Sequence, residues 1–361
     1  MKKIILSIKI ILISLLLFII IGEILFRYIF NSESLQTRIN INKYAITNIK
    51  NINSKFDSRN LRFQPYSKSK IYHSEYSLEV SHDKYGFRNP CYNFKLEAQK
   101  ILIGDSFVYG IGVNDKETLG CQLKNYSKNI YTVAIPGSGP THYILTLIKN
   151  QDNLKKLSKN NLIIDVIIFT GNDYEDLLSI DYPINESFVL KSDDNKNLLE
   201  YLNELTKYSS IVQKSYLLQM IKLSYVKISK RNEKENFYYN YAGSTFYKNR
   251  SPDEIEKLTK SLNFFIKSIE NIGFKFGKIY LLPDPSEVSI ERLIRDSKLG
   301  FFNIKEIDFE YKFKNLTAAC TNLKINCVDL RKIFTSSDYY IYDNHIKKAG
   351  VIKLSKSMIN F

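Results

Sequence analysis

The sequence predicts an α/β protein built on a doubly wound, mostly parallel sheet of five strands. Short apolar runs rich in β-branched residues recur from Lys100 onward, which is typical of strands buried on both faces. A turn of small residues and then a helical stretch follow these runs, and alternation of this kind is typical of α/β folds. The five runs are Ile101–Ile103, Ile130–Ile135, Ile163–Phe169, Ile279–Leu282 and Ile325–Val328.

One helix is legible in detail. Ser251-Pro252-Asp253-Glu254 combines a capping box with a proline at the first helical position, and Gly273 offers a stop. Between them, apolar residues recur at helical spacing, which predicts one buried face. These apolar residues are Ile255, Leu258, Leu262, Phe265, Ile266 and Ile269. The stretch 174–250 is too long for a simple crossover and has a helical apolar pattern from Leu198 to Ile228, so we expect an inserted helical cap there.

The N-terminus predicts a membrane segment. Lys2 and Lys3 precede an apolar run, and Ile4 to Gly22 can span a bilayer if Lys9 extends its long side chain to the interface. No small-residue cleavage site follows, so we expect a retained signal anchor within residues 1–30; a cleaved signal peptide is the alternative. The basic residues favour a cytoplasmic amino end.

The expected organisation follows from this anchor. We predict a single-pass protein of the inner (cytoplasmic) membrane whose catalytic domain is extracytoplasmic. Residues 31–95 are polar, rich in Asn and Ser and weakly periodic, and are interpreted as a stalk and lead-in segment. Residues 96–361 would form the domain.

Composition excludes some classes of partner and leaves others open. The net charge is +15, but the basic residues are scattered and no nucleic-acid motif accompanies them, so no nucleic-acid partner is expected. A cationic surface would favour anionic lipid head groups or acidic glycans. Four cysteines allow three disulfide pairings, and free buried thiols are an alternative. Because no CxxC or HxxxH spacing occurs, we expect no metal, and no cofactor is implied.

Four polar clusters lie where ligands bind in an open α/β sheet, at the carboxyl ends of strands. Three of them directly follow predicted strands, and the fourth follows the last strand after a short segment. We therefore expect them on one rim of the sheet, as a single site. The clusters are Gly104-Asp105-Ser106, Pro136-Gly137-Ser138-Gly139, Thr170-Gly171-Asn172-Asp173 and Asp343-Asn344-His345.

These clusters contain the parts of a nucleophilic serine site. A serine hydroxyl needs a base within hydrogen-bond reach. Of four histidines, only His345 has a carboxylate two residues before it, and residues i and i+2 of an extended segment share a face. We therefore expect Ser106 as nucleophile and His345 as base, with Asp343 fixing the imidazole tautomer. Asp105 and Asp173 are interpreted as structural, holding their loops through backbone hydrogen bonds.

Stabilisation of an oxyanion requires preorganised donors. The candidates are the backbone N–H groups of Ser106 and Gly137 and the side-chain amide of Asn172. Gly139 competes with Gly137, which is favoured because it ends the strand more directly. Each residue also has a structural interpretation, since serine and asparagine cap helices and glycines form tight turns. Their joint occurrence favours catalysis.

The order of these motifs resembles that of the SGNH/GDSL hydrolase family. The matching stretches are ILIGDSFVYGIGV, VAIPGSGPTH, IIFTGNDYEDL and YDNHIKKAG, and the resemblance covers roughly residues 82–355. It implies a flavodoxin-like SGNH fold, with Ser106 as nucleophile, Gly137 and Asn172 as oxyanion donors and His345 as base. Asp343 matches the family's carboxylate, although many members place it three residues before the histidine. The segment HDKYGFRNP resembles the region before the serine block in bacterial membrane-anchored members.

The resemblance implies a serine esterase that hydrolyses acyl esters through an acyl-enzyme. An anchored, exported member would act on an O-acylated, typically acetylated, envelope or exopolysaccharide glycan. One alternative is an O-acetyltransferase that passes the acyl group to a glycan. Another is a non-catalytic glycan-binding or assembly protein on a hydrolase fold. A phosphate-binding nucleotide enzyme is disfavoured, because no GxxxxGK[ST] spacing occurs.

Overall fold

The computed structural model describes a defined part of the chain. In those residues no helix is long and apolar enough to cross a membrane. The predicted span Ile4–Gly22 and the predicted cap at 174–250 lie largely outside them. Described residues up to 24 belong to one compact unit and those from 56 onward to another. The described residues are 14, 17, 20–24, 56–73, 75–158, 160–179, 253–289, 308, 310–341 and 343–360.

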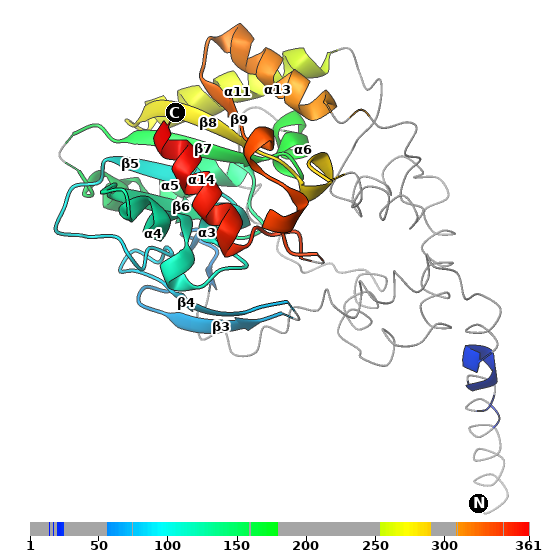
Figure 1. The fold of residues 1–361 in the computed structure, drawn as a ribbon. Coiled ribbons are helices and arrows are strands. Elements are labelled where there is room, and N and C mark those ends of the chain that lie inside the picture. Colours follow the sequence, from blue (N-terminus) through cyan, green and yellow to red (C-terminus); the bar gives the residue numbers. More distant parts are fainter. Residues whose placement is uncertain are drawn as a thin grey trace, which may run out of the picture. The chain divides into compact units, whose positions relative to one another are not determined.

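A five-stranded parallel sheet forms the centre of the larger unit (Figure 1). The strands lie in the order β6-β5-β7-β8-β9, and every neighbouring pair is parallel. Counted along the chain, this order is 2-1-3-4-5, which is typical of flavodoxin-like sheets. The prediction of an α/β fold is confirmed. The strands are β5 (Lys100–Gly104), β6 (Ile130–Ala134), β7 (Ile163–Phe169), β8 (Lys275–Leu282) and β9 (Cys327–Asp329).

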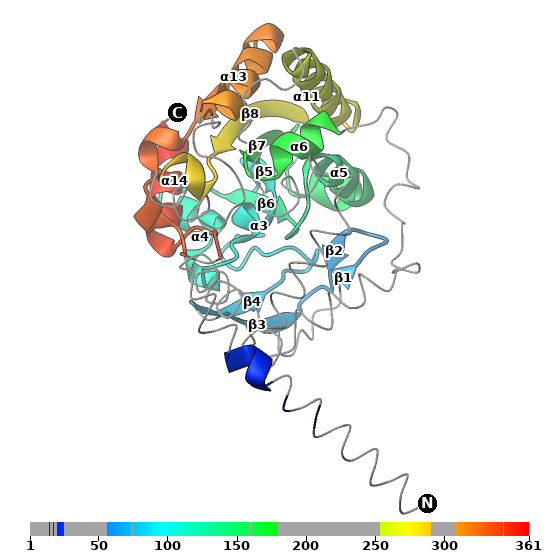
Figure 2. The same cartoon turned by 90° about the vertical axis from the view of Figure 1, so that its right-hand side faces the viewer.

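Helices cover both faces of this sheet (Figure 2). Leu102 and Tyr280 pack in a cluster with residues of α3, α4 and α14. Their strand neighbours Ile101 and Leu281 pack in a second cluster with residues of α5, α11 and α13. The helices are α3 (Ser106–Tyr109), α4 (Leu119–Lys124), α5 (Pro140–Lys155), α6 (Asp173–Leu178), α11 (Glu254–Asn271), α13 (Tyr311–Leu323) and α14 (Lys348–Asn360). Short 3-10 helices are η1 (Asp115–Glu117), η3 (Pro285–Glu287), η5 (Arg331–Ile333) and η6 (Ser336–Asp338).

Helix α11 matches the predicted amphipathic pattern. Leu258, Leu262, Phe265 and Ile269 are fully buried, as their spacing of three and four residues requires. The helix ends just before Gly273, which has a φ of 96° that favours glycine. Residues 251 and 252 of the predicted capping box lie outside the described residues.

Two antiparallel hairpins precede the sheet, within the segment that the sequence analysis interpreted as stalk and lead-in. They are β1 (Phe56–Asp57) with β2 (Arg62–Phe63), and β3 (Lys68–Tyr72) with β4 (Ser77–Ser81). Leu78 and Val80 are buried in the same cluster as α3, whereas Ser77 and Glu79 are exposed and Ser81 is half-buried. This alternation is typical of an antiparallel sheet with one face exposed to solvent. Because the segment is polar overall, the alternation was not recognised in the sequence. The domain boundaries themselves stay a prediction.

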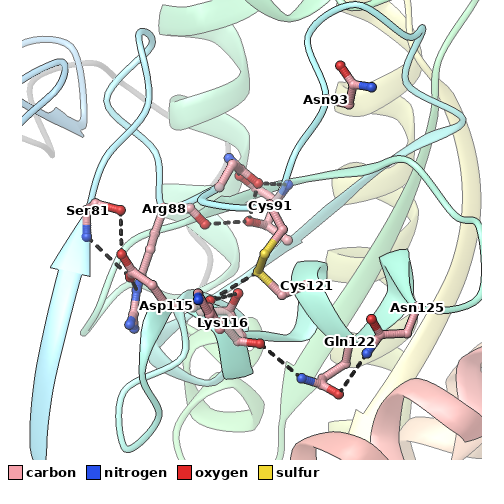
Figure 3. Close-up of a disulfide and its surroundings, with 12 residues drawn as sticks. Ser81, Arg88, Cys91, Asn93, Asp115, Lys116, Cys121, Gln122 and Asn125 are labelled. Carbon is pink, nitrogen blue, oxygen red and sulfur yellow. Dashed lines mark hydrogen bonds and ion pairs between the residues drawn. A yellow bond between two sulfur atoms is a disulfide. The ribbon is translucent and has the colours of Figure 1, made fainter.

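A buried arginine joins the second hairpin to the loop that follows α3 in the chain (Figure 3). The Arg88 side chain is 1% exposed, and its Nε donates to the Asp115 carboxylate at 2.9 Å. Its Nη1 and Nη2 donate to four backbone carbonyls at 2.7–3.3 Å. A buried cation is tolerated when its donors are satisfied in this way. The accepting carbonyls belong to Glu79, Tyr109, Gly110 and Val113.

All four cysteines form disulfides, which resolves the pairing that the sequence left open. Cys91 pairs with Cys121 and so ties the segment after Arg88 to α4 (Figure 3). Cys320 pairs with Cys327 and ties α13 to β9. Each closed loop restricts the unfolded chain, a contribution that is typically about 2–4 kcal/mol.

We expect Arg88→Met to lower the free energy of unfolding by ~3–5 kcal/mol, because Asp115 and four carbonyls lose their buried donor. The measurement is urea denaturation followed by circular dichroism. Lys70→Met is the control, since the Lys70–Glu79 ion pair on the same hairpin is exposed and should leave the midpoint nearly unchanged. Equal midpoints for both variants would contradict the importance of Arg88.

Candidate active site

Ser106 stands at the sharp turn between β5 and α3. The N-cap residue of α3 is Asp105, whose carboxylate accepts a hydrogen bond from the Phe107 N–H at 2.9 Å. The alternative in which Ser106 caps the helix is therefore not observed. As first residue of the helix, Ser106 has its hydroxyl available for another partner.

That partner is His345. The distance between His345 Nε2 and Ser106 Oγ is 2.8 Å, and His345 Nδ1 lies 2.8 Å from Asp343 Oδ2. A carboxylate can only accept, so Nδ1 carries the proton and Nε2 is free to accept from the serine hydroxyl. The Phe107 ring lies 5.0 Å from the imidazole, centre to centre. Three residues that the sequence analysis singled out thus form one hydrogen-bonded chain.

The charge of Asp343 is maintained by its hydrogen bonds. Burial opposes ionisation of this carboxyl, but the hydrogen bond and charge of His345 and the hydrogen bond from Tyr76 outweigh burial and hold the pKa of Asp343 below its ordinary value. An ionised carboxylate is the form that fixes the imidazole tautomer and stabilises an imidazolium.

The segment that carries Asp343 and His345 is held against the loop behind α3. Tyr339 and Ile346 form an isolated antiparallel bridge, and the Tyr340 N–H donates to the His345 carbonyl at 2.9 Å. The Tyr340 hydroxyl donates to the Gly112 carbonyl at 2.8 Å. Gly112 has a φ of 92°, and a Cβ there would lie 2.9 Å from the Tyr340 ring. Glycine is therefore required for this close approach.

The candidate oxyanion loops follow the two strands that flank β5. Gly137 lies beyond the end of β6, is exposed, and has a φ of 74° with nothing within 4 Å of an added Cβ. Gly139 is buried directly before α5, where an added Cβ would clash with the Asp176 carboxylate. Of the two competing glycines, Gly137 therefore has the open position, whereas Gly139 serves packing.

Asn172 follows β7, and a buried carboxylate orients its side chain. The Asn172 amide is exposed and donates to Asp173 Oδ1 at 2.9 Å. Asp173 Oδ2 in turn accepts from the Phe169 N–H at 3.0 Å and the Tyr143 hydroxyl at 2.9 Å. Asp173 thus holds its loop through a backbone hydrogen bond, as expected, and also positions the asparagine amide.

Two buried carboxyls lie behind the site. Burial raises the pKa of Asp105 to about 6, with the Phe107 N–H and the charge of His345 acting in the opposite direction. Burial and then the charge of Asp105 raise the pKa of Asp173 well above its ordinary value. Because charging these two buried carboxyls costs free energy, the stability of the structure next to Ser106 depends on pH.

The other histidines have different surroundings. His73 and His82 lie in or next to the second hairpin, where His82 contacts the hydroxyls of Ser67 and Tyr109 at 2.9 Å. His142 is exposed in the first turn of α5. Across the described ranges, no group of three or more His, Cys, Asp or Glu side chains is arranged to hold a metal ion.

Two residues of the site were missed by the sequence analysis. The Tyr76 hydroxyl donates to Asp343 Oδ2 at 2.6 Å, and the Glu75 carboxylate accepts from the Asp343 N–H at 2.9 Å. Both lie in the turn between β3 and β4, 267 and 268 positions from their partner. No motif in the sequence marks this turn, so its contact with Asp343 is visible only in the folded structure.

Comparison with known proteins leaves the family open. No protein-family model matches the chain, and neither does any curated protein. Among solved structures, it is similar to the lipase Lip_vut3 from a goat rumen metagenome (12% identity, 73% of this chain and 96% of that one, TM-score 0.38). It is also similar to the protein YxiM from Bacillus subtilis (9% identity, 73% and 56%, TM-score 0.35). Similarity at this level assigns no activity to this chain.

We expect the stability of Asp105→Asn, relative to the unmodified protein, to improve as pH rises from 4 to 7. A carboxyl whose pKa is raised by folding stabilises the native state at low pH, and that contribution is lost as pH rises toward the folded pKa of about 6. Asparagine keeps an oxygen that can accept from the Phe107 N–H and has no charge to bury. Thermal unfolding of both proteins at several pH values is the measurement, and a difference in Tm independent of pH would contradict it.

Proposed function

We propose that the protein is a serine esterase of the SGNH/GDSL type that hydrolyses acyl esters. The observation that carries this proposal is the chain of two 2.8 Å hydrogen bonds from Ser106 through His345 to Asp343. Both distances lie in the range expected for an activated nucleophile and its oriented base. The serine stands at the carboxyl end of the central strands, where ligands bind in sheets of this order.

The mechanism follows from the positions of these groups. Ser106 Oγ attacks the ester carbonyl while His345 Nε2 takes the proton of the serine hydroxyl. The backbone N–H groups of Ser106 and Gly137 and the Asn172 amide stabilise the oxyanion. His345 then returns the proton to the leaving alcohol, and an acyl group remains on Ser106. His345 then takes a proton from water, whose oxygen attacks the acyl carbonyl. The bond to Ser106 Oγ breaks, the acid leaves, and His345 returns the proton to the serine.

The proposed substrate is an O-acylated carbohydrate, typically acetylated, outside the cytoplasmic membrane. The predicted N-terminal anchor supports this location. Two disulfides are also typical of an oxidising compartment. The net charge of +15 suits an acidic envelope or exopolysaccharide glycan. Product analysis with and without a glycan acceptor distinguishes hydrolysis from acyl transfer.

We expect a fluorophosphonate probe to label the full chain, purified in mild detergent, at Ser106. The probe reacts only with a serine whose hydroxyl is activated by a base, so His345→Ala should abolish labelling. Mass spectrometry of the modified peptide is the measurement, and His142→Ala is the matched control. A folded protein that stays unlabelled would favour a non-catalytic glycan-binding role instead.

We expect Asn172→Ala to lower kcat for an activated acetyl ester by roughly 10²–10³-fold with a much smaller change in KM, because the lost donor acts mainly in the transition state. Asn125→Ala is the control, since the Asn125 amide contacts Gln122 at the end of α4. Steady-state kinetics of both variants provide the comparison. Equal kcat values for the two variants would show that Asn172 does not act as an oxyanion donor.

A further inference from the structure

The turn of the second hairpin contacts the proposed catalytic carboxylate directly. The Tyr76 hydroxyl donates to Asp343 Oδ2 at 2.6 Å, and the same oxygen accepts from His345 Nδ1. The Tyr76 ring packs against the rings of His73 and Tyr340, at 4.7 and 4.9 Å between ring centres. Burial, followed by the charge of Asp343, raises the pKa of Tyr76 far above its ordinary value. The hydroxyl therefore remains protonated, and a donor, over the pH range in which the protein is folded.

Glu75 holds the backbone of the same loop. Its Oε1 accepts from the Ile341 N–H at 2.8 Å and its Oε2 from the Asp343 N–H at 2.9 Å. A carboxylate that accepts two N–H groups, one on each oxygen, restricts both the position and the rotation of the segment it binds. The Glu75 side chain is 14% exposed, so water competes little for these bonds.

We propose that Glu75 and Tyr76 are positioning residues that set the orientation and charge of the Asp343–His345 pair. Glu75 fixes the backbone that carries Asp343, and Tyr76 fixes its carboxylate. Since Tyr76 donates to the oxygen that also binds His345, it withdraws part of the negative charge that the imidazolium experiences. The second hairpin, which precedes the parallel sheet along the chain, then belongs to the active site, a conclusion that rests on the proposed esterase function.

The hairpin does not depend on these contacts for its own place. Ile71, Leu78 and Val80 are buried in the cluster that includes α3, and Arg88 donates to the Glu79 carbonyl. Removing one hydroxyl from Tyr76 leaves this packing and the aromatic stacking intact. A conservative variant therefore separates positioning from folding.

The first experiment compares Tyr76→Phe with Tyr72→Phe in the full chain, using a p-nitrophenyl acetate assay. Tyr72 belongs to the same hairpin and is 41% exposed. We expect Tyr76→Phe to lower kcat on the order of 10–100-fold with little change in KM, because a misplaced base lowers the rate of proton transfer. Tyr72→Phe should match the unmodified protein, and all three should have similar Tm values.

The pH profile provides a readout that a structural role would not change. Without the Tyr76 donor, Asp343 Oδ2 has more charge to stabilise the imidazolium, so the acidic limb of kcat/KM should shift to higher pH. Glu75→Gln leaves that donor in place but turns an N–H-bearing amide toward one backbone N–H, so kcat should fall without this shift. Charged or titratable groups that act on Asp343 or lie beside it are His345, Tyr76, His73, Tyr340 and Glu75.

Proton NMR separates this proposal from the esterase proposal. The Nδ1–H shared by His345 and Asp343 should give a downfield signal that moves in Tyr76→Phe and not in Tyr72→Phe. If Ser106 is never labelled but this signal still moves, positioning holds and the esterase function is wrong. If Ser106 is labelled and Tyr76→Phe has unchanged kcat, pH profile and signal, the positioning role is overturned. A kcat loss accompanied by an equal loss of folded protein overturns it as well.

Discussion

The arrangement of the site depends on one buried guanidinium whose N–H donors all have hydrogen-bond acceptors. Arg88 donates to Asp115 and to carbonyls in the middle of β4, at the end of α3 and in the loop that follows α3. Next to it, Asn89 pairs with Thr132 of β6 through side-chain bonds of 2.8 and 2.9 Å to the strand backbone. A hairpin, a strand and the helix that begins with Ser106 are thereby joined as one body. The turn that carries Glu75 and Tyr76 belongs to the hairpin so anchored, and for this reason it can act on a loop near the C-terminus.

Carboxylates position the groups proposed to act in the site. Asp105 caps α3, Asp173 orients the Asn172 amide, and Asp343 orients His345. Their electrostatic situations differ: hydrogen bonds from His345 and Tyr76 keep Asp343 ionised, while burial raises the pKa values of the other two. The same residue type can thus provide a fixed charge in one place and a pH-sensitive hydrogen-bond acceptor in another.

The fold was predictable to the extent that its signals are local. Strands buried on both faces have continuous apolar runs, so the sheet was found, although β8 begins at Lys275 rather than Ile279 because its first residues are exposed or half-buried. The polar clusters after the strands were also legible, since parallel strands deliver their ends to one edge. The hairpins were not, because alternate burial in short polar strands is a weak signal.

The strands, the amphipathic helix α11 and the Ser, Asn, Asp and His residues at the ends of strands could all be recognised from the amino-acid sequence. Three features could be seen only in the folded chain: the pairing of the cysteines, the open position of Gly137 against the packed position of Gly139, and the contact of Tyr76 with Asp343. Helix and strand patterns arise from interactions between residues a few positions apart, which a sequence displays directly. Contacts across 267 positions form only when the whole core closes around them, and no local pattern encodes their geometry.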